Sequence, residues 1–347
     1  MGVKLSSRNM TKSKVPKRNH GVLYNLKAIN KLIEKDGPSK VVLITSANVQ
    51  LRLRDIFDRF FKNMPVIIIP DGEKAKSWRS IEKLLKKFLH LGLDRQALVI
   101  AVGGGTVGDS AGFAASIYLR GIKYINVPTT LLAQVDSSHG GKTGIDFENA
   151  KNQIGSFYPA IATIIDGEAI NSNGLEQIIG GLGEIIKVGL IKDKSILSLL
   201  RKESVSTLSR SKKLHKIIKK SIKAKYFYVS KDEKDKGVRQ VLNFGHTIGH
   251  AIELKYKISH GRAVLIGMVK ELEIAERLKL TKPYVRENLL NLYGILGIGF
   301  TDKYKADWKA VLKDKKLVGD KIVLPIVVRE GVSKLVKIPL LKLKKLI

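Results

Sequence analysis

Short runs of apolar, mostly β-branched residues recur through the first half of the chain, each about the length of one buried strand. Continuous runs of this kind are typical of strands covered on both faces, as in a parallel sheet. They lie at residues 41–45, 66–69, 97–102, 124–127 and 160–166. Between the second and third runs, residues 77–91 have helical periodicity, with Trp78, Ile81, Leu84, Leu85 and Phe88 on one stripe. Strands that alternate with helices predict a parallel α/β sheet.

After about residue 170 the pattern changes to long helical repeats. The predicted helices span residues 174–190, 194–203, 208–230, 240–256, 261–278 and 283–296, and only residues 321–328 look extended. We therefore predict an α/β domain over residues 1–170 and a mainly α-helical domain over residues 171–347.

The length and composition favour a two-domain protein and exclude several kinds of functional site. At 347 residues with 44% apolar content, the chain is long enough for two cores. It has no cysteine, which excludes disulfides, thiolate metal sites and cysteine nucleophiles, and which is compatible with a reducing cytosol. Since no apolar run reaches the roughly 18 residues of a membrane span, we expect a cytoplasmic protein without membrane association.

The net charge of +32 suggests nucleic-acid binding as one interpretation. However, Lys and Arg are spread along the whole chain among acids, and aromatic residues make up only 6%. Attraction for an anionic substrate, or a generally lysine-rich proteome, explains the charge as well, so we expect no specific nucleic-acid partner. The first 33 residues contain eight Lys or Arg and no acid. A transit segment is the alternative there, but a solvated basic arm over residues 1–20 is the favoured interpretation.

The stretch from Arg239 to His250 concentrates metal-binding chemistry. On a helix, Asn243, His246 and His250 would share one face, and the two imidazoles are spaced i, i+4. His260 would arrive from the following loop, and Glu184 is a candidate carboxylate partner. Two imidazoles and one carboxylate are the ligand set of a catalytic zinc-type site. The alternative is a set of polar residues on a partly buried helix.

Glycine-rich segments in the first half are candidate anion-binding turns. Residues 103–109 read Gly-Gly-Gly-Thr-Val-Gly-Asp between a predicted strand and a predicted helix, where a phosphate can meet the helix N-terminus. The alternative is a tight turn without a ligand. Residues 136–142 place two glycines beside Lys142, and Lys151-Asn152 follows in a further polar loop. Charged solvent loops are the alternative for both.

Taken together and in order, these motifs resemble the 3-dehydroquinate synthases, within the sugar-phosphate cyclases and beside the iron-type alcohol and glycerol dehydrogenases. The resemblance extends from about residue 41 to 328. It rests on residues 71–76, 103–113, 118–121, 127–132, 134–138, 140–143, 151–152, 183–187, 242–250 and 260–261.

The resemblance implies a Rossmann-like NAD-binding domain followed by a helical domain for metal and substrate. It also implies a shikimate-pathway reaction in which 3-deoxy-D-arabino-heptulosonate 7-phosphate becomes 3-dehydroquinate and phosphate. In that reaction bound NAD⁺ transiently oxidises the C5 alcohol, phosphate is eliminated, the ketone is reduced and the ring closes by an aldol step. A divalent metal, zinc or cobalt, would polarise the reacting oxygens.

The resemblance also assigns residues by position. The implied metal ligands are Glu184, His246 and His260. The implied NAD contacts are Glu73, Lys76, Gly104, Gly105, Asp109, Thr129, Thr130, Lys151, Ser172 and Lys187. The implied substrate pocket comprises Asp136, Lys142, Asn152, Lys225, Arg239, Asn243, His250 and Lys315. Of these, the predicted catalytic set is Asp136, Lys142, Lys225, Arg239, Asn243 and His250, with His250 moving a proton near the phosphate. Arg120 would reach the phosphate of a neighbouring subunit, which implies a homodimer.

Lys225 and Arg239 favour a substrate that carries a carboxylate, which both cations would hold. Ordinary surface charge is the alternative for the pair. Other sugar-phosphate cyclases and NAD-dependent polyol or glycerol-phosphate dehydrogenases are the competing enzymes, and neither type of substrate needs such a pair. A basic scaffolding or nucleic-acid-binding protein without catalysis is the competing non-enzyme.

Several positions depart from the family pattern. Arg262 stands where an acidic residue usually follows the metal-binding His-Gly, so we expect weaker metal binding or rearranged local pairing. Ser46 stands where an Asp is common near the adenosine ribose, and His139 where a small apolar residue is common. The best candidate for the first strand is Gly21–Tyr24.

Overall fold

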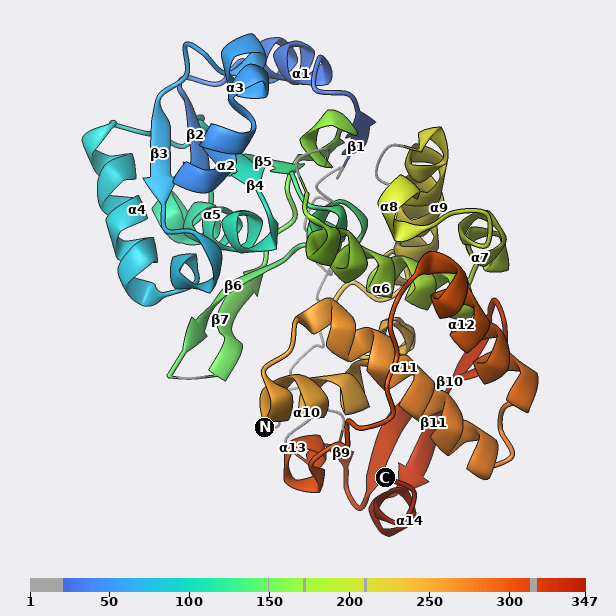
Figure 1. Ribbon diagram of the computed structural model, residues 1–347. Helices are drawn as coiled ribbons and strands as arrows, with labels where there is room; N and C mark the ends of the chain where they lie inside the picture. Colours follow the sequence, from blue (N-terminus) through green and yellow to red (C-terminus); the bar gives the residue numbers. More distant parts are fainter. Residues whose placement is uncertain (1–20, 149, 171–172, 209–210, 313–316) are drawn as a thin grey trace, which may run out of the picture.

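A computed structural model describes residues 21–148, 150–170, 173–208, 211–312 and 317–347 of the protein (Figure 1). Its N-terminal half is built on a six-stranded sheet in the order β1-β8-β5-β4-β2-β3, in which every neighbouring pair is parallel. The strands are β1 (Gly21–Tyr24), β2 (Val41–Ser46), β3 (Val66–Ile69), β4 (Leu98–Gly103), β5 (Lys123–Pro128) and β8 (Ala162–Ile165). The predicted parallel sheet is confirmed, with strand ends displaced by a few residues at most.

Helices cover both faces of this sheet, as the all-apolar strands require. Along β4, Val99 and Ala101 enter the core formed with the buried stripe of α4, while Leu98, Ile100 and Val102 enter the core on the opposite face. The helices of this half are α1 (Ala28–Asp36), α2 (Ala47–Arg52), α3 (Arg54–Phe60), α4 (Trp78–His90) and α5 (Gly105–Ile117). The predicted α4 stripe is buried at Ile81, Leu84 and Phe88 and partly buried at Leu85, whereas Trp78 at its N-terminal end is 51% exposed.

A two-stranded antiparallel hairpin extends from the sheet domain toward the C-terminal half (Figure 1). It consists of β6 (Lys142–Phe147) and β7 (Ala150–Phe157). The prediction of a polar loop at Lys151-Asn152 was wrong, because both residues lie in β7. Residues 143–145 of β6 are buried against α5, and this packing supplies the driving force that the polar sequence of β7 does not reveal.

The C-terminal half is mainly helical and ends in a small antiparallel sheet, with the order β11-β10-β9. Its elements are α6 (Leu175–Ile191), α7 (Lys194–Leu200), α8 (Val205–Leu208), α9 (Lys212–Val229), α10 (His246–Tyr256), α11 (His260–Arg277), α12 (Pro283–Leu296), α13 (Trp308–Leu312), β9 (Leu317–Val318), β10 (Lys321–Arg329), β11 (Val332–Pro339) and α14 (Leu340–Lys344). Five of the six predicted helices are confirmed in place, and the predicted extended segment is β10.

The predicted helix over residues 240–256 was wrong in its first third. A short 3₁₀ turn, η5 (Val238–Asn243), ends before the break, and α10 starts only at His246. The break falls at Gly245, whose φ is +79°. A Cβ there would lie 2.5 Å from the Met268 side chain. Asn243 and His246 therefore do not belong to one helix.

The long helix α6 lies where the two halves of the molecule meet (Figure 1). Leu131 and Val135 of the first half join the core formed by α6, α9 and α11. The predicted domain boundary near residue 170 stays a prediction. Within the described residues, no helix combines the length and apolar character needed to cross a bilayer.

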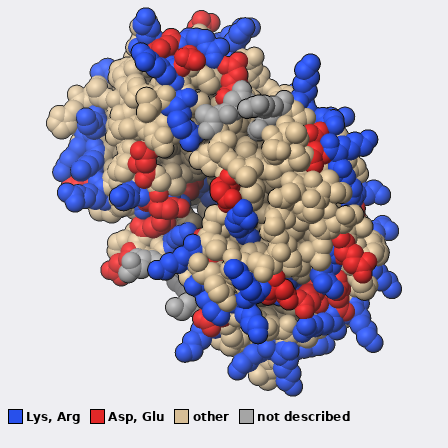
Figure 2. Space-filling model, viewed as in Figure 1, with Lys and Arg blue, Asp and Glu red and all other residues tan. Residues whose placement is uncertain are grey.

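Charged side chains are dispersed over the surface. Figure 2 shows Lys and Arg over much of the visible face, with acidic side chains among them. On this face the excess positive charge does not gather into one continuous stripe.

Candidate active site

Three helix segments bring imidazoles and a carboxylate together between the two halves of the molecule. His246 and His260 are the first residues of α10 and α11, and Glu184 lies in the middle of α6. The Nε2 atoms of His246 and His260 lie 3.3 Å and 4.0 Å from Glu184 Oε1. His260 thus begins a helix, whereas the sequence had suggested a loop.

His250 also belongs to this cluster. One ring nitrogen from each of His246, His250 and His260 lies within 4.8 Å of the others, a spacing at which one metal ion can be shared. The i, i+4 spacing had suggested that His250 shares a site with His246, and the family resemblance assigned His250 to proton transfer; the structure places it beside the predicted ligands.

The outer nitrogens of two imidazoles are already engaged. His246 Nδ1 lies 3.1 Å from the Phe244 carbonyl oxygen, and His260 Nδ1 lies 2.9 Å from Glu253 Oε2. A carbonyl or carboxylate oxygen can only accept here, so each Nδ1 donates its hydrogen. Each Nε2 lone pair then faces the interior of the cluster, which is the arrangement of metal-binding histidines.

The cluster fits a divalent metal ion. Glu184 is 3% exposed, and within the described residues neither of its carboxylate oxygens meets hydrogen-bond geometry, although Lys187 and His246 lie within ion-pair distance. A buried carboxylate with unused acceptor capacity beside inward-facing imidazole nitrogens is a ligand set for zinc or cobalt.

Electrostatics keep Glu184 and His246 in the forms that bind metal, whereas at His260 the effect of burial is outweighed by the hydrogen bond to Glu253, and the pKa of His260 is raised. Burial alone would raise the pKa of Glu184, but the Lys187 ammonium outweighs it and holds that pKa well below its ordinary value. Burial lowers the pKa of His246. A carboxylate and a neutral imidazole are therefore favoured.

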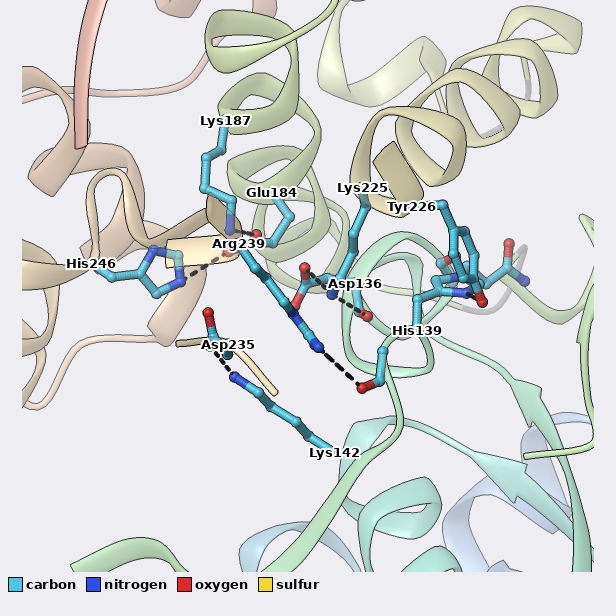
Figure 3. A network of polar contacts seen from close by, with 12 residues as sticks. Asp136, His139, Lys142, Glu184, Lys187, Lys225, Tyr226, Asp235, Arg239 and His246 are labelled. Atoms are coloured by element: carbon cyan, nitrogen blue, oxygen red, sulfur yellow. Dashed lines mark hydrogen bonds and ion pairs between the residues drawn. The ribbon is translucent and has the colours of Figure 1, made fainter. Parts of the chain in front are cut away.

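Next to the metal cluster lies a network of buried cations (Figure 3). Lys225 Nζ donates to both the backbone oxygen and Oδ1 of Asp136, each at 2.6 Å. The Arg239 guanidinium donates to the carbonyl oxygens of Gly140 and Glu233. Arg239 is 3% exposed, yet within the described residues it has no carboxylate at ion-pair distance.

Burial and the ion pair with Lys225 have opposite effects on the pKa of Asp136. Burial alone would raise its pKa, but the Lys225 ammonium outweighs it and holds that pKa below its ordinary value. Lys142 forms an ion pair with Asp235 at the outer edge of the same network.

Four of the predicted nucleotide contacts, Gly104, Gly105, Thr129 and Thr130, lie at the start of α5. Thr129 N donates to the Gly103 carbonyl oxygen at 2.9 Å, and Thr130 lies beside Gly104, the residue that caps α5. Backbone N–H groups at a helix N-terminus bind phosphate oxygens.

Lys76 contacts two further segments of this region. It pairs with Asp109 at 2.8 Å and donates to Asn152 of the hairpin. Burial raises the pKa of Asp109 to about 6, against the opposing effect of Lys76. Glu73 is exposed in the short turn η1 (Gly72–Ala75), close enough to Asp109 and Lys151 to affect their titration electrostatically.

The Arg262 guanidinium is directed to Glu176 and not to the metal cluster. Its guanidinium makes a two-pronged ion pair with Glu176, with Nε 2.7 Å from Oε2 and an Nη 2.6 Å from Oε1. Arg262 thus has its own carboxylate partner, as the expected change in local pairing requires. This ion pair links the start of α11 to the start of α6. Ser46 caps α2 by accepting from Val49 N at 3.5 Å.

Some predicted site residues are not joined to these clusters. Arg120 is exposed in the turn η2 (Tyr118–Arg120), and in the described part of the chain no hydrogen bond or ion pair links it to the pocket. Lys187, predicted to contact NAD, forms an ion pair with Glu184 of the metal cluster. Ser172, Lys315 and the basic arm over residues 1–20 lie outside the described residues.

The sequence analysis missed Glu253, Asp235 and Tyr226. Glu253 lies seven positions after His246 and three after His250, so the helical spacing could have identified it. Asp235 and Tyr226 gave no such signal, because their partners Lys142 and His139 lie in a distant segment.

Comparisons with known proteins decide between the enzyme families. The sequence model of the 3-dehydroquinate synthase N-terminal region matches residues 66–179, and that of the C-terminal region matches residues 181–317. The 3-dehydroquinate synthase of Clostridium kluyveri is 42% identical over 313 residues, which cover 86% of each chain. That of Sulfurisphaera tokodaii is 41% identical over 331 residues, 92% of each chain. The chain belongs to the 3-dehydroquinate synthase family.

Solved structures place this 3-dehydroquinate synthase family member in a wider fold group. A 2-deoxy-scyllo-inosose synthase complexed with carbaglucose-6-phosphate, NAD⁺ and Co²⁺ has a TM-score of 0.81 at 26% identity, covering 93% of this chain and 95% of its own. The 2-epi-5-epi-valiolone synthase of Streptomyces hygroscopicus, with NAD⁺ and Zn²⁺, has a TM-score of 0.81 at 20% identity, covering 99% and 98%. An iron-containing alcohol dehydrogenase of Corynebacterium glutamicum has a TM-score of 0.59 at 14% identity, covering 84% and 85%. The last two show the shared fold, which confirms the predicted fold class.

Proposed function

We propose that the protein converts 3-deoxy-D-arabino-heptulosonate 7-phosphate to 3-dehydroquinate and phosphate in the cytoplasm, as a homodimer that uses NAD⁺ and zinc or cobalt. The observation that carries the choice of substrate is Arg239, a buried guanidinium hydrogen-bonded to carbonyl oxygens, with no carboxylate at ion-pair distance in the described residues. A buried cation of this kind is stabilised by an anion that the protein does not itself provide.

The substrate carboxylate is that anion in our proposal. Arg239 offers two parallel N–H groups to a carboxylate, and Lys225 adds a second cation held at Asp136. Asp136, Lys142, Asn152, Asn243 and Lys315 would complete the pocket around the sugar. Arg120 of a second subunit would meet the phosphate.

Glu184, His246 and His260 would hold the metal, and residues 103–105 with Lys76, Asp109, Thr129, Thr130 and Lys151 would hold the nucleotide, together with Glu73, Ser172 and Lys187. When bound, the metal would supply a Lewis acid and NAD⁺ a hydride acceptor.

Protein side chains position the substrate and move its protons. His250 is exposed at the edge of the cluster, where its imidazole can exchange a proton near the departing phosphate. Lys225 and Arg239 anchor the opposite end of the substrate, which fixes its reacting carbons relative to the metal ligands.

The deciding experiment supplies the substrate, catalytic NAD⁺ and zinc to the purified protein. Phosphate release is followed alongside dehydroquinate, which a coupled dehydratase reports. We expect equal amounts of both products without net NADH. Accumulation of NADH would indicate a polyol dehydrogenase instead, and turnover of only a neutral sugar phosphate would indicate another cyclase.

Arg239→Ala tests the carboxylate role directly. We expect a loss of at least about 2 kcal/mol of transition-state stabilisation, a thirtyfold fall in kcat/KM, because a charge-assisted pair is removed. Arg277→Ala, which removes an exposed arginine paired with Glu273 on α11, is the matched control and should leave kcat/KM unchanged. Equal activities of the two variants would contradict the assignment.

A further inference from the structure

The loop that receives both buried cations is a single short segment. It begins in η3 (Ala133–Ser137), a turn of π-helix that carries Asp136, and continues through His139 to Gly140. Lys225 binds the loop at Asp136, and Arg239 binds it at Gly140. The conformation of residues 136–140 therefore determines the distance between the two cations.

Gly140 admits Arg239 only because it has no side chain. Its φ is +103°, and a Cβ there would lie 2.2 Å from a guanidinium nitrogen of Arg239. At the other end of the loop, the Asp136 carbonyl oxygen accepts hydrogen bonds from both Lys225 Nζ and the His139 backbone N–H. The position of Lys225 is therefore tied to the backbone of His139.

His139 lies between these two attachment points and is 2% exposed. Its Nε2 is 2.8 Å from the Gln134 carbonyl oxygen, and its Nδ1 is 3.4 Å from the Tyr226 hydroxyl oxygen. Because a carbonyl only accepts, Nε2 carries the hydrogen and Nδ1 accepts from the Tyr226 hydroxyl. The two rings also meet edge to face, with centroids 5.4 Å apart.

Tyr226 is the neighbour of Lys225 on α9. The His139 ring therefore joins the turn that carries Asp136 to the helix that carries Lys225, independently of the ion pair between those two residues. Burial raises the pKa of the Tyr226 hydroxyl, which keeps it a donor. In Figure 3, His139 and Tyr226 lie on the opposite side of Asp136 and Lys225 from His246.

We propose that His139 and Tyr226 are positioning residues that fix the spacing of Lys225 and Arg239 for a carboxylate-bearing substrate. The inference rests on the proposed function. A histidine that only fills space in the core would stabilise the fold, and its loss would not weaken binding of the carboxylate end selectively. A positioning role instead predicts a loss confined to carboxylate recognition.

The test compares Tyr226→Phe with Tyr228→Phe. Both remove one hydroxyl from a tyrosine of α9, but Tyr228 donates to the Ile191 carbonyl oxygen at 3.3 Å, away from the loop. We expect Tyr226→Phe to raise the KM for the sugar-acid phosphate about fivefold with little change in kcat, as the loss of one hydrogen bond that orients a binding group predicts. Tyr228→Phe should leave both constants unchanged, and neither variant should alter the KM for NAD⁺.

His139→Ala and His139→Gln examine the other partner. We expect His139→Ala to raise the same KM about tenfold, and His139→Gln to restore part of it, because the Gln amide can still donate toward the Gln134 carbonyl. If His139→Ala does not fold, Tyr226→Phe, which keeps the aromatic ring, decides.

Titration calorimetry measures the contribution of the substrate carboxylate to binding without turnover. The probes are a non-hydrolysable phosphonate analogue of the substrate and the same analogue lacking the carboxylate. We expect Tyr226→Phe to weaken only the first. Equal weakening of both, or the same KM in Tyr226→Phe and Tyr228→Phe, would overturn the positioning role. Failure of the unaltered enzyme to turn over the substrate would instead overturn the proposed function.

Discussion

Glu253 connects the nucleotide region to the proposed metal ligands through one carboxylate. One oxygen accepts from Lys151 of the hairpin at 2.8 Å, and the other accepts from His260 Nδ1 at 2.9 Å. Burial alone would raise the pKa of Glu253, but these two partners lower it to about 2. The carboxylate thus stays ionised and orients His260.

Glu253→Gln should weaken metal binding. The amide cannot accept at both positions, so His260 loses its orientation, and we expect a 10–100-fold fall in metal affinity. Competition with a chelator measures it. Glu273→Gln on α11, which removes a half-buried carboxylate paired with Arg277 and Lys270, is the control. Equal resistance of both variants to the chelator would refute the role of Glu253.

Asp109 should make stability depend on pH. Its pKa is raised from 3.8 to about 6 by burial, with Glu73 and Asp146 adding to the rise and Lys76 opposing it. Between these values the folded protein holds a proton that the unfolded chain releases. The stabilisation is therefore complete below about pH 4 and lost as pH rises through 6, at most about 3 kcal/mol. Denaturant unfolding without added nucleotide should show this fall in the natural protein and not in Asp109→Asn. Parallel pH profiles would contradict it.

Among the elements, the crossing of α10 and α11 determines where two imidazoles lie. The helices approach through glycines, and a Cβ on Gly267 would lie 2.0 Å from the Gly245 carbonyl oxygen and 2.7 Å from Gly249 N. Backbone atoms cannot yield as a flexible side chain does. This close approach holds His246 and His260 with ring centroids 5.4 Å apart.

Gly267→Ala should separate these helices. We expect a destabilisation of about 3 kcal/mol from overpacking, together with reduced metal retention, measured by denaturant unfolding and metal analysis. Gly294→Ala in α12 is the matched control, since nothing lies within 4 Å of its Cβ position. It should be neutral or more stable by up to about 1 kcal/mol. Similar unfolding of the two variants would contradict the close-packing argument.

For the whole molecule, the proposed homodimer concerns the cation that would meet the substrate phosphate. Arg120 is exposed in η2, with φ at +64°, and the proposed homodimer would place it in the partner's site. Closed twofold symmetry would complete both sites at once.

Subunit mixing tests this arrangement. Arg120→Ala and His246→Ala should each be inactive alone. After exchange of subunits, a mixed dimer contains one site with both residues intact, so about a quarter of all sites should recover. Light scattering confirms that dimers are present. If these mixtures stay inactive, while mixtures of each variant with the natural chain retain the activity of the natural subunits, Arg120 lies in its own subunit's site. Full activity of Arg120→Ala alone would place Arg120 outside the mechanism.

The sequence by itself determined the local structure and the chemical inventory. Apolar runs located the parallel strands because strands buried on both faces need continuous apolar side chains, and helical periodicity located α6, α9 and α12. Motif order also singled out Glu184, His246 and His260, which the fold brings together.

Tertiary structure alone decided what those elements do together. The left-handed Gly245 divides Asn243 from His246 because only glycine tolerates the approach of α11, and the hairpin carrying Lys151 forms because residues 143–145 pack on α5. Arg262 turns to Glu176, and His139 meets Tyr226, across 86 and 87 positions of chain. Periodicity reports only neighbours within a few residues, whereas such pairings depend on how the helices pack against one another.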